Sequence, residues 1–132
     1  MTTAKPFLMF QGGNAQAALE LYFAAFPDSG MVRVERYSEG ELGPTGTIKV
    51  AVFTLCGREY MCSDSPIEHK FSFTPSSSTF VEFDSLEDLE RAFDILSEGG
   101  EVLMPLNNYD FSQKFGWVND RFGVSWQLNL TA

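Results

Sequence analysis

The same series of predicted secondary-structure elements occurs twice along this chain, and this repeat limits the possible folds more than any other feature. Each half is expected to run strand, helix, strand, strand, strand, with halves of about 1–70 and 71–132. A unit of this kind leaves one apolar sheet face uncovered, so it needs a second copy to bury that face. The sequence therefore predicts one α+β domain spanning 1–132, in which paired βαβββ modules form a curved mixed sheet around a cavity with the helices outside.

Both helices are predicted from apolar spacing and from the residues that flank them. In the first half, apolar residues recur at helical spacing over 15–26, after Asn14 as the expected N-cap. In the second half, Ser85 is the expected N-cap of a helix over 86–98, and Gly99 stands where such a helix ends. The strands fall between these segments and the turns, at 6–10, 31–37, 47–55, 59–63, 78–83, 101–106, 114–118 and 124–128, with 107–110 as a loop.

The last strand alternates apolar and polar side chains. One face receives Val124, Trp126 and Leu128, and the other receives Ser125, Gln127 and Asn129. The apolar face suits packing against a helix. The polar face carries small groups that can line a cavity.

Charge and composition limit the partners. The chain has a formal net charge of -9 and a pI near 4.4, so it repels nucleic acid and anionic membranes. No stretch reaches the roughly 20 apolar residues of a membrane helix, and residues 1–6 do not look like a secretion signal. With only Cys56 and Cys62, both read as reduced thiols, we expect a cytoplasmic protein.

The run GWVNDRFGVSWQL at 116–128 resembles the C-terminal signature of the PhnB-like group, often labelled 3-demethylubiquinone methyltransferase-like. This group belongs to the vicinal oxygen chelate superfamily, together with glyoxalase I, extradiol dioxygenases and bleomycin-resistance proteins. The resemblance implies a glyoxalase-like fold of paired βαβββ modules. It also implies a homodimer.

Metal-using relatives are expected to hold their ion through His and Glu residues on four strands. By strand, the resemblance places those ligands at or near Lys5, at Met61 or Cys62, near Ser78 and at Gln127. None of these is a histidine or a carboxylate, whereas a catalytic transition-metal site needs at least three imidazole, thiolate or carboxylate ligands. We therefore expect no metal and no other cofactor.

The methyltransferase label has no support in the residues. A common adenosylmethionine enzyme needs a doubly wound parallel sheet with a Gly-rich turn between strand and helix. Gly12-Gly13 is the one candidate, and it lacks the G-x-G-x-x-G spacing. The prediction is that this chain is not a genuine methyltransferase.

The leading hypothesis is a protein that binds a small, partly apolar molecule in the cavity of the curved sheet. Pockets of this type are mostly apolar with a few polar groups that orient the ligand. The expected pocket residues are Gln127, Ser125, Asn129, Trp117, Ser78, Phe80, Glu82 and Cys62.

Two other functions stay open. A metal-dependent or acid–base lyase, isomerase or dioxygenase-like enzyme could use Glu82, His69 or Cys62. His69 lies in a polar loop with no nucleophile or orienting partner visible in the sequence, so an exposed surface position is expected. Of the two cysteines, Cys62 is the stronger candidate nucleophile. A purely structural, partner-binding module would instead lack the cavity.

Overall fold

The computed structural model describes residues 1–131, which divide into two compact units between Lys70 and Phe71. Each unit holds one four-stranded mixed sheet and one helix. Neither helix of the described residues is long and apolar enough to cross a membrane.

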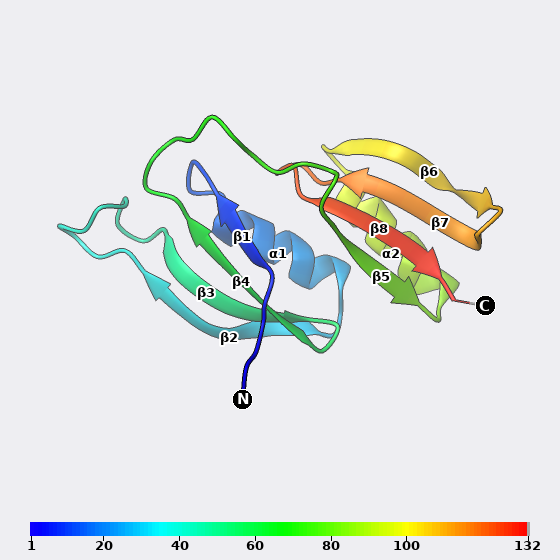
Figure 1. Ribbon diagram of the computed structural model, residues 1–132, viewed down its shortest axis with the longest axis horizontal. Coiled ribbons are helices and arrows are strands. Elements are labelled where there is room, and N and C mark those ends of the chain that lie inside the picture. The colour runs from blue at the N-terminus through cyan, green and yellow to red at the C-terminus, as the bar shows by residue number, and fades with distance from the viewer. Residues whose placement is uncertain (132) are drawn as a thin grey trace. The chain divides into compact units, whose positions relative to one another are not determined.

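The first unit contains five elements in the predicted order. They are β1 (Phe7–Phe10), α1 (Ala15–Ala25), β2 (Ser29–Arg36), β3 (Ile48–Leu55) and β4 (Arg58–Asp64). The sheet order is β1-β4-β3-β2, with β1 and β4 parallel and the other pairs antiparallel (Figure 1). Helix α1 packs on one face of this sheet, where the rings of Phe23 and Phe53 form a T-shaped contact with their centroids 6.2 Å apart.

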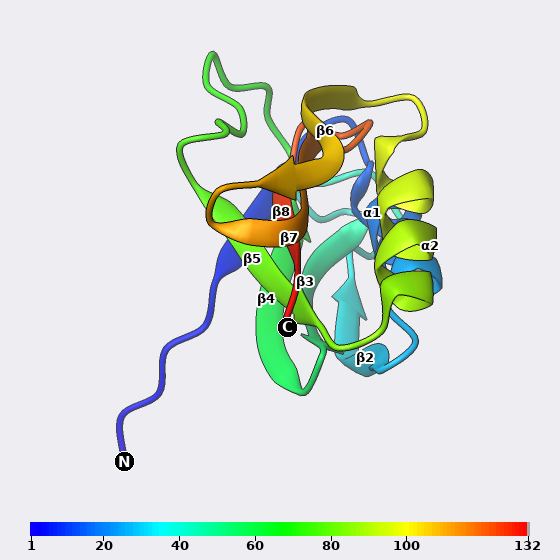
Figure 2. The same cartoon turned by 90° about the vertical axis from the view of Figure 1, so that its right-hand side faces the viewer.

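The second unit repeats this arrangement. Its elements are β5 (Ser78–Phe83), α2 (Leu86–Ser97), β6 (Glu101–Tyr109), β7 (Ser112–Asn119) and β8 (Ser125–Leu130). The sheet order is β5-β8-β7-β6, with β5 and β8 parallel, and α2 lies against one face (Figure 2). The predicted α+β class with two βαβββ modules is confirmed. That the sheets enclose a cavity stays a prediction.

The apolar face of β8 packs as expected. Trp126 and Leu128 are fully buried, and Leu128 pairs with Gly116 of β7. A Cβ at Gly116 would lie 2.5 Å from the Phe93 ring of α2, so the absent side chain lets the helix approach the sheet. This face of the second sheet is therefore the one that α2 covers.

The predicted loop over 107–110 is wrong. Strand β6 continues to Tyr109, because Asn107 pairs with Phe115 and Tyr109 pairs with Ser112. Two asparagines suggest a turn by propensity, but the neighbouring strand β7 supplies a pairing partner that overrides it. The register of the β6–β7 pair shifts between Val102 and Met104, between Met104 and Asn107, and between Asn107 and Tyr109.

The two helices begin in different ways. The Ser85 side chain accepts a hydrogen bond from Asp88 N–H at 3.2 Å, which confirms the predicted N-cap of α2. Asn14 stands at the N-cap position of α1, but its side chain donates to Gln11 O instead and caps nothing. The capping role belongs to Asp64, at the end of β4. Its Oδ1 accepts from Ala15 N–H and its Oδ2 from Ile48 N–H, both at 2.8 Å.

A second buried carboxylate organises the break between β7 and β8. Asp120 is 3% exposed, and its Oδ1 accepts from the N–H groups of Phe122 and Val124. Its Oδ2 accepts from Trp126 Nε1 at 3.0 Å. This carboxylate thus joins the turn to the core of the second unit.

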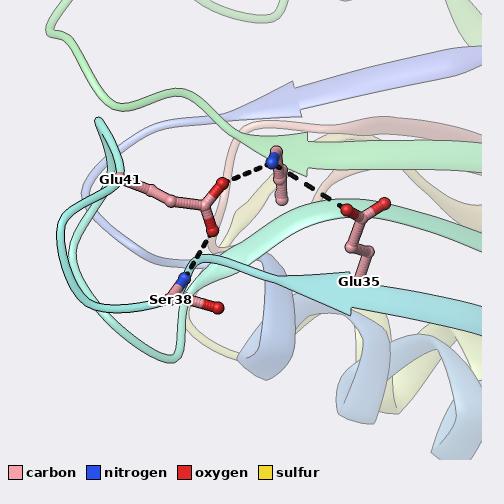
Figure 3. A network of polar contacts seen from close by, with 4 residues as sticks. Glu35, Ser38 and Glu41 are labelled. Atoms are coloured by element: carbon pink, nitrogen blue, oxygen red, sulfur yellow. Dashed lines mark hydrogen bonds and ion pairs between the residues drawn. The ribbon is translucent and has the colours of Figure 1, made fainter.

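The long connection between β2 and β3 is attached to the sheet through a network of polar contacts, of which Figure 3 labels Glu35, Ser38 and Glu41. The Lys49 ammonium lies 2.5 Å from Glu41 and 3.9 Å from Glu35, and Glu41 also accepts from Ser38 N–H. The hydrogen bond from Lys49 lowers the pKa of Glu41, and the same contact raises the pKa of Lys49. Because these groups are solvated, the network contributes little to stability.

Candidate functional site

Seven of the eight predicted pocket residues share one face of the second sheet. Along β5 and β8, Ser78 pairs with Ser125, Phe80 with Gln127, and Glu82 with Asn129, and Trp117 of β7 pairs with Gln127. Paired residues on neighbouring strands point to the same side of a sheet. Because Gly116 faces α2, its neighbour Trp117 and all of its partners face away from the helix. We call this the open face: Ser78, Phe80, Glu82, Trp117, Ser125, Gln127 and Asn129.

Polar groups of the open face hold one another in place. Gln127 Nε2 donates to Ser78 Oγ at 2.7 Å, and Trp117 Nε1 donates to Ser125 Oγ at 2.8 Å. Ser112 Oγ donates to Asn129 Oδ1. Within residues 1–131 Gln127 makes this one side-chain bond, so its amide oxygen can still accept from a ligand. The face is therefore ordered before any ligand binds.

Aromatic rings stand beside these polar groups. Phe80 is 51% exposed, and its ring centroid lies 6.1 Å from that of Phe115. Phe111 is 66% exposed and forms a T-shaped contact with Phe115, with a centroid distance of 4.9 Å. Tyr109 stacks on Phe111 at 5.9 Å. Phe111, Phe115 and Tyr109 were missed in the sequence, although the alternation along β7 already placed Phe115 on the same face as Trp117.

A pocket of about 680 Å³ opens at the end of the second sheet. Glu82 and Asn129 line it together with the β6–β7 turn, whose residues Tyr109, Phe111 and Ser112 also belong to the aromatic and polar groups just described. The pocket therefore joins predicted site residues to the ring cluster that the sequence did not reveal.

Cys62 lies elsewhere. It is fully buried in the first unit, where its neighbours Tyr60 and Asp64 on the same side of β4 contact Phe53 and the start of α1. Burial, followed by the Asp64 carboxylate, raises the pKa of the Cys62 thiol to about 12. The expectation that Cys62 is the stronger nucleophile is wrong, because the exposed thiol is Cys56, in the β3–β4 turn.

The positions at which relatives would hold a metal do not fit one here. Ser78 and Gln127 bind each other, and Lys5 forms an ion pair with Glu59 at 3.5 Å. Met61 pairs with Phe7 on the face away from α1, whereas Cys62 is on the covered side. In the described part of the chain, no three His, Cys, Asp or Glu residues gather in a way that could hold a metal ion.

His69 is not the exposed, partnerless residue expected. It is half-buried, and its Nε2 lies 2.8 Å from Ser65 Oγ. Its backbone N–H donates to Gln11 Oε1 at 2.7 Å. Nothing in the sequence indicated this contact, because Gln11 directly follows β1 and is 58 residues away from His69 in the chain.

Residues 2–129 match the model of a family described as 3-demethylubiquinone-9 3-methyltransferase. The Escherichia coli (strain K12) protein YjdN is 26% identical over 137 residues, covering 95% of this chain and 92% of that protein. The solved structure of a PhnB protein from Bacillus cereus is 45% identical with a TM-score of 0.94, covering 98% and 100% of the two chains. Protein PA1353 from Pseudomonas aeruginosa is 28% identical with a TM-score of 0.83, covering 98% of each chain.

A more distant likeness shows the fold alone. The fosfomycin resistance protein FosX from Listeria monocytogenes is 12% identical with a TM-score of 0.61, covering 97% of this chain and 88% of that one. That protein was solved as a mutant in complex with Mn(II) and a dihydroxypropylphosphonic acid. The glyoxalase-like fold is therefore shared well beyond the range of recognisable sequence.

Proposed function

This chain belongs to the 3-demethylubiquinone-9 3-methyltransferase family, the PhnB-like group of the vicinal oxygen chelate superfamily, and from that premise we propose that it binds a small, partly apolar molecule at the open face of its second sheet. The proposal includes no metal and no methyl transfer. The sequence leads us to expect one domain, and the superfamily resemblance leads us to expect a homodimer, which light scattering on the purified protein would test.

The observation that carries the proposal is the bond between Gln127 and Ser78 beside the half-exposed ring of Phe80. Phe80 offers apolar surface to a ligand, and the amide of Gln127 is already oriented next to it. A side chain fixed before binding loses less entropy when the ligand arrives. The two features together suit a molecule with one apolar part and one hydrogen-bonding part.

The donor groups support binding without a metal. Gln127 and Ser78 present an amide and a hydroxyl, which are poor ligands for divalent transition metals, and the Gln127 amide nitrogen already donates to Ser78 Oγ. Glu82 is the one carboxylate on the open face. The ligand we propose is neutral or cationic, since the chain carries a net charge of -9.

The topology of the two sheets supports the absence of methyl transfer. Both sheets are mixed, each with a single parallel pair, and neither has the doubly wound order of the common adenosylmethionine enzymes.

A thermal-shift screen of neutral and cationic small molecules tests the proposal. A ligand at a hundred times its Kd stabilises the folded state by about 2.7 kcal/mol, a rise in midpoint that is readily measured. Phe80→Ala and Gln127→Met should weaken a binder at least tenfold. Leu86→Ala is the matched control, because Leu86 is 46% exposed on α2, away from the open face.

Three results would contradict the proposal. Binders that ignore both open-face variants would place the site elsewhere. A rise in the unfolding midpoint with adenosylmethionine, together with methyl transfer to a quinone acceptor, would show that the chain is the methyltransferase that the family description names. Stoichiometric zinc, nickel, manganese or iron in the purified protein, lost in Gln127→Met, would show a metal site.

A further inference from the structure

Ser65 and His69 form a close pair that the proposed function does not use. Ser65 Oγ lies 2.8 Å from His69 Nε2, which is hydrogen-bond distance between a hydroxyl and an imidazole. Both residues are half-buried and belong to the segment that follows β4. A hydroxyl bound to an imidazole nitrogen is the arrangement by which a serine becomes a nucleophile.

The pair is held from outside its own loop. Ser65 N–H donates to Phe10 O at 2.8 Å, which fixes the serine at the end of β1. His69 N–H donates to Gln11 Oε1 at 2.7 Å, which attaches the histidine to the residue that follows Phe10. Two hydrogen bonds, one to the Phe10 carbonyl and one to the Gln11 side chain, therefore hold the backbones of Ser65 and His69 next to the end of β1 in the first unit.

Ser65 opens onto a pocket of about 620 Å³ in the first unit. Pro44, Pro66 and Ile67 give this pocket apolar walls, and Gly12 and Gly13 form part of its lining. Both glycines are exposed and have positive φ, of 71° and 76°. Because neither residue carries a side chain, backbone atoms form this part of the lining, and backbone N–H groups are the kind of donor that stabilises a developing oxyanion.

We propose that Ser65 and His69 hydrolyse small carboxylic esters in this pocket. Ser65 Oγ attacks the ester carbonyl carbon while its proton passes to His69 Nε2. The tetrahedral intermediate then collapses, the carbon–oxygen bond to the alcohol breaks, and His69 returns the proton to the leaving alkoxide. Water deprotonated by His69 attacks the acyl-serine, which releases the carboxylic acid and regenerates Ser65.

Charge selects the substrate. Glu68 and Asp64 both line the pocket, and Asp64 is buried and bound to two backbone N–H groups. These carboxylates disfavour an anionic acyl group. The substrate class is therefore a small, neutral or cationic ester.

The test uses p-nitrophenyl acetate with the full chain. The wild-type protein should release nitrophenolate faster than buffer does, and intact-mass and peptide analysis should find an acetyl group on Ser65. Ser65→Ala should remove that acetylation, and His69→Gln, which keeps hydrogen-bonding atoms but cannot act as the base, should slow it about a hundredfold. Ser63→Ala is the matched control, since Ser63 lies two residues earlier on β4 and outside the pair.

Release that is unchanged in Ser65→Ala and His69→Gln would overturn the proposal, as would acetyl groups confined to lysines or to Cys56. Circular dichroism and the unfolding midpoint of each variant identify a folding defect. If one variant is misfolded, acetylation in the other decides, because each removes a different partner of the same step. Ser63→Ala and Leu86→Ala, which change residues of neither candidate site, should leave the esterase rate unchanged.

Discussion

The two units have the same strand order and the same parallel pair, yet they present different chemistry on corresponding faces. In the second sheet, Gln127 lies between Phe80 and Trp117 in the register. In the first sheet, Met61 lies between Phe7 and Val52 in the same way. One backbone arrangement therefore carries a polar amide in one copy and an apolar thioether in the other. The duplicated fold sets the position, and the residue type decides what the position can bind.

The units also differ in how their helices are stabilised. α2 is strongly charged on its outer side and is capped by Ser85, its own neighbour in sequence. α1 contains one charged residue, Glu20, and depends on Asp64, which lies 49 residues after the amide that it caps. The second helix is therefore specified locally, whereas the first is completed only when β4 has reached its place in the sheet.

Replacing Asp64 should have the largest effect. Asp64→Ala leaves two buried N–H groups, of Ala15 and Ile48, without their acceptor, and we expect a loss of about 3 kcal/mol in the free energy of unfolding. Urea unfolding measures it. A loss under about 1 kcal/mol, as for an ordinary local cap, would remove the distinction between the two helices.

Asp120→Asn in the second unit should cost about 2 kcal/mol, because the amide keeps an acceptor for the turn but points a donor at Trp126 Nε1. Denaturant unfolding followed by tryptophan fluorescence measures both the stability and the environment of the indole. Stability equal to the wild type would mean that Trp126 is held by packing alone.

The N-cap residues should respond unequally. Ser85→Ala should cost about 1 kcal/mol because it removes the bond to Asp88 N–H, while Asn14→Ala should cost only a few tenths. Thermal unfolding of both variants under one condition makes the comparison. Equal losses would show that Asn14 caps α1 in solution.

The smallest effect concerns the loop network around Lys49. Because the pKa of Glu41 is lowered from 4.5, its contribution is present above that value and fades as pH falls through the folded pKa. Because the pKa of Lys49 is raised from 10.5, its contribution persists below that value and is lost as pH rises through the folded pKa. Between these two pH limits, the protection of the Ser38 amide from hydrogen exchange should therefore stay constant, once the rate is corrected for the intrinsic exchange rate at each pH. A change near neutral pH would contradict the ion pair.

Much of the fold follows from local pattern. Helical spacing predicted both helices, and Ser85 predicted the N-terminus of α2. The alternation along β8 placed Trp126 and Gln127 on opposite faces of the sheet. The failures came where a distant partner outweighs the local preference. Asn107 and Asn108 favour a turn by propensity, but Asn107 pairs with Phe115 of β7. Asn14 stands at the N-cap position of α1, but the Asp64 carboxylate accepts the hydrogen bond from the helix.

In the candidate sites too, local pattern predicted the faces on which residues lie, but not the contacts between distant segments. Period-two alternation and strand order were enough to place Ser78, Phe80 and Gln127 on one face, because side-chain direction in a strand depends only on position. The sequence could not show that Ser78 binds Gln127, that Cys62 is buried, or that Ser65 meets His69. Contacts of that kind require the sheet to bring separate segments together, so only the tertiary structure decides them.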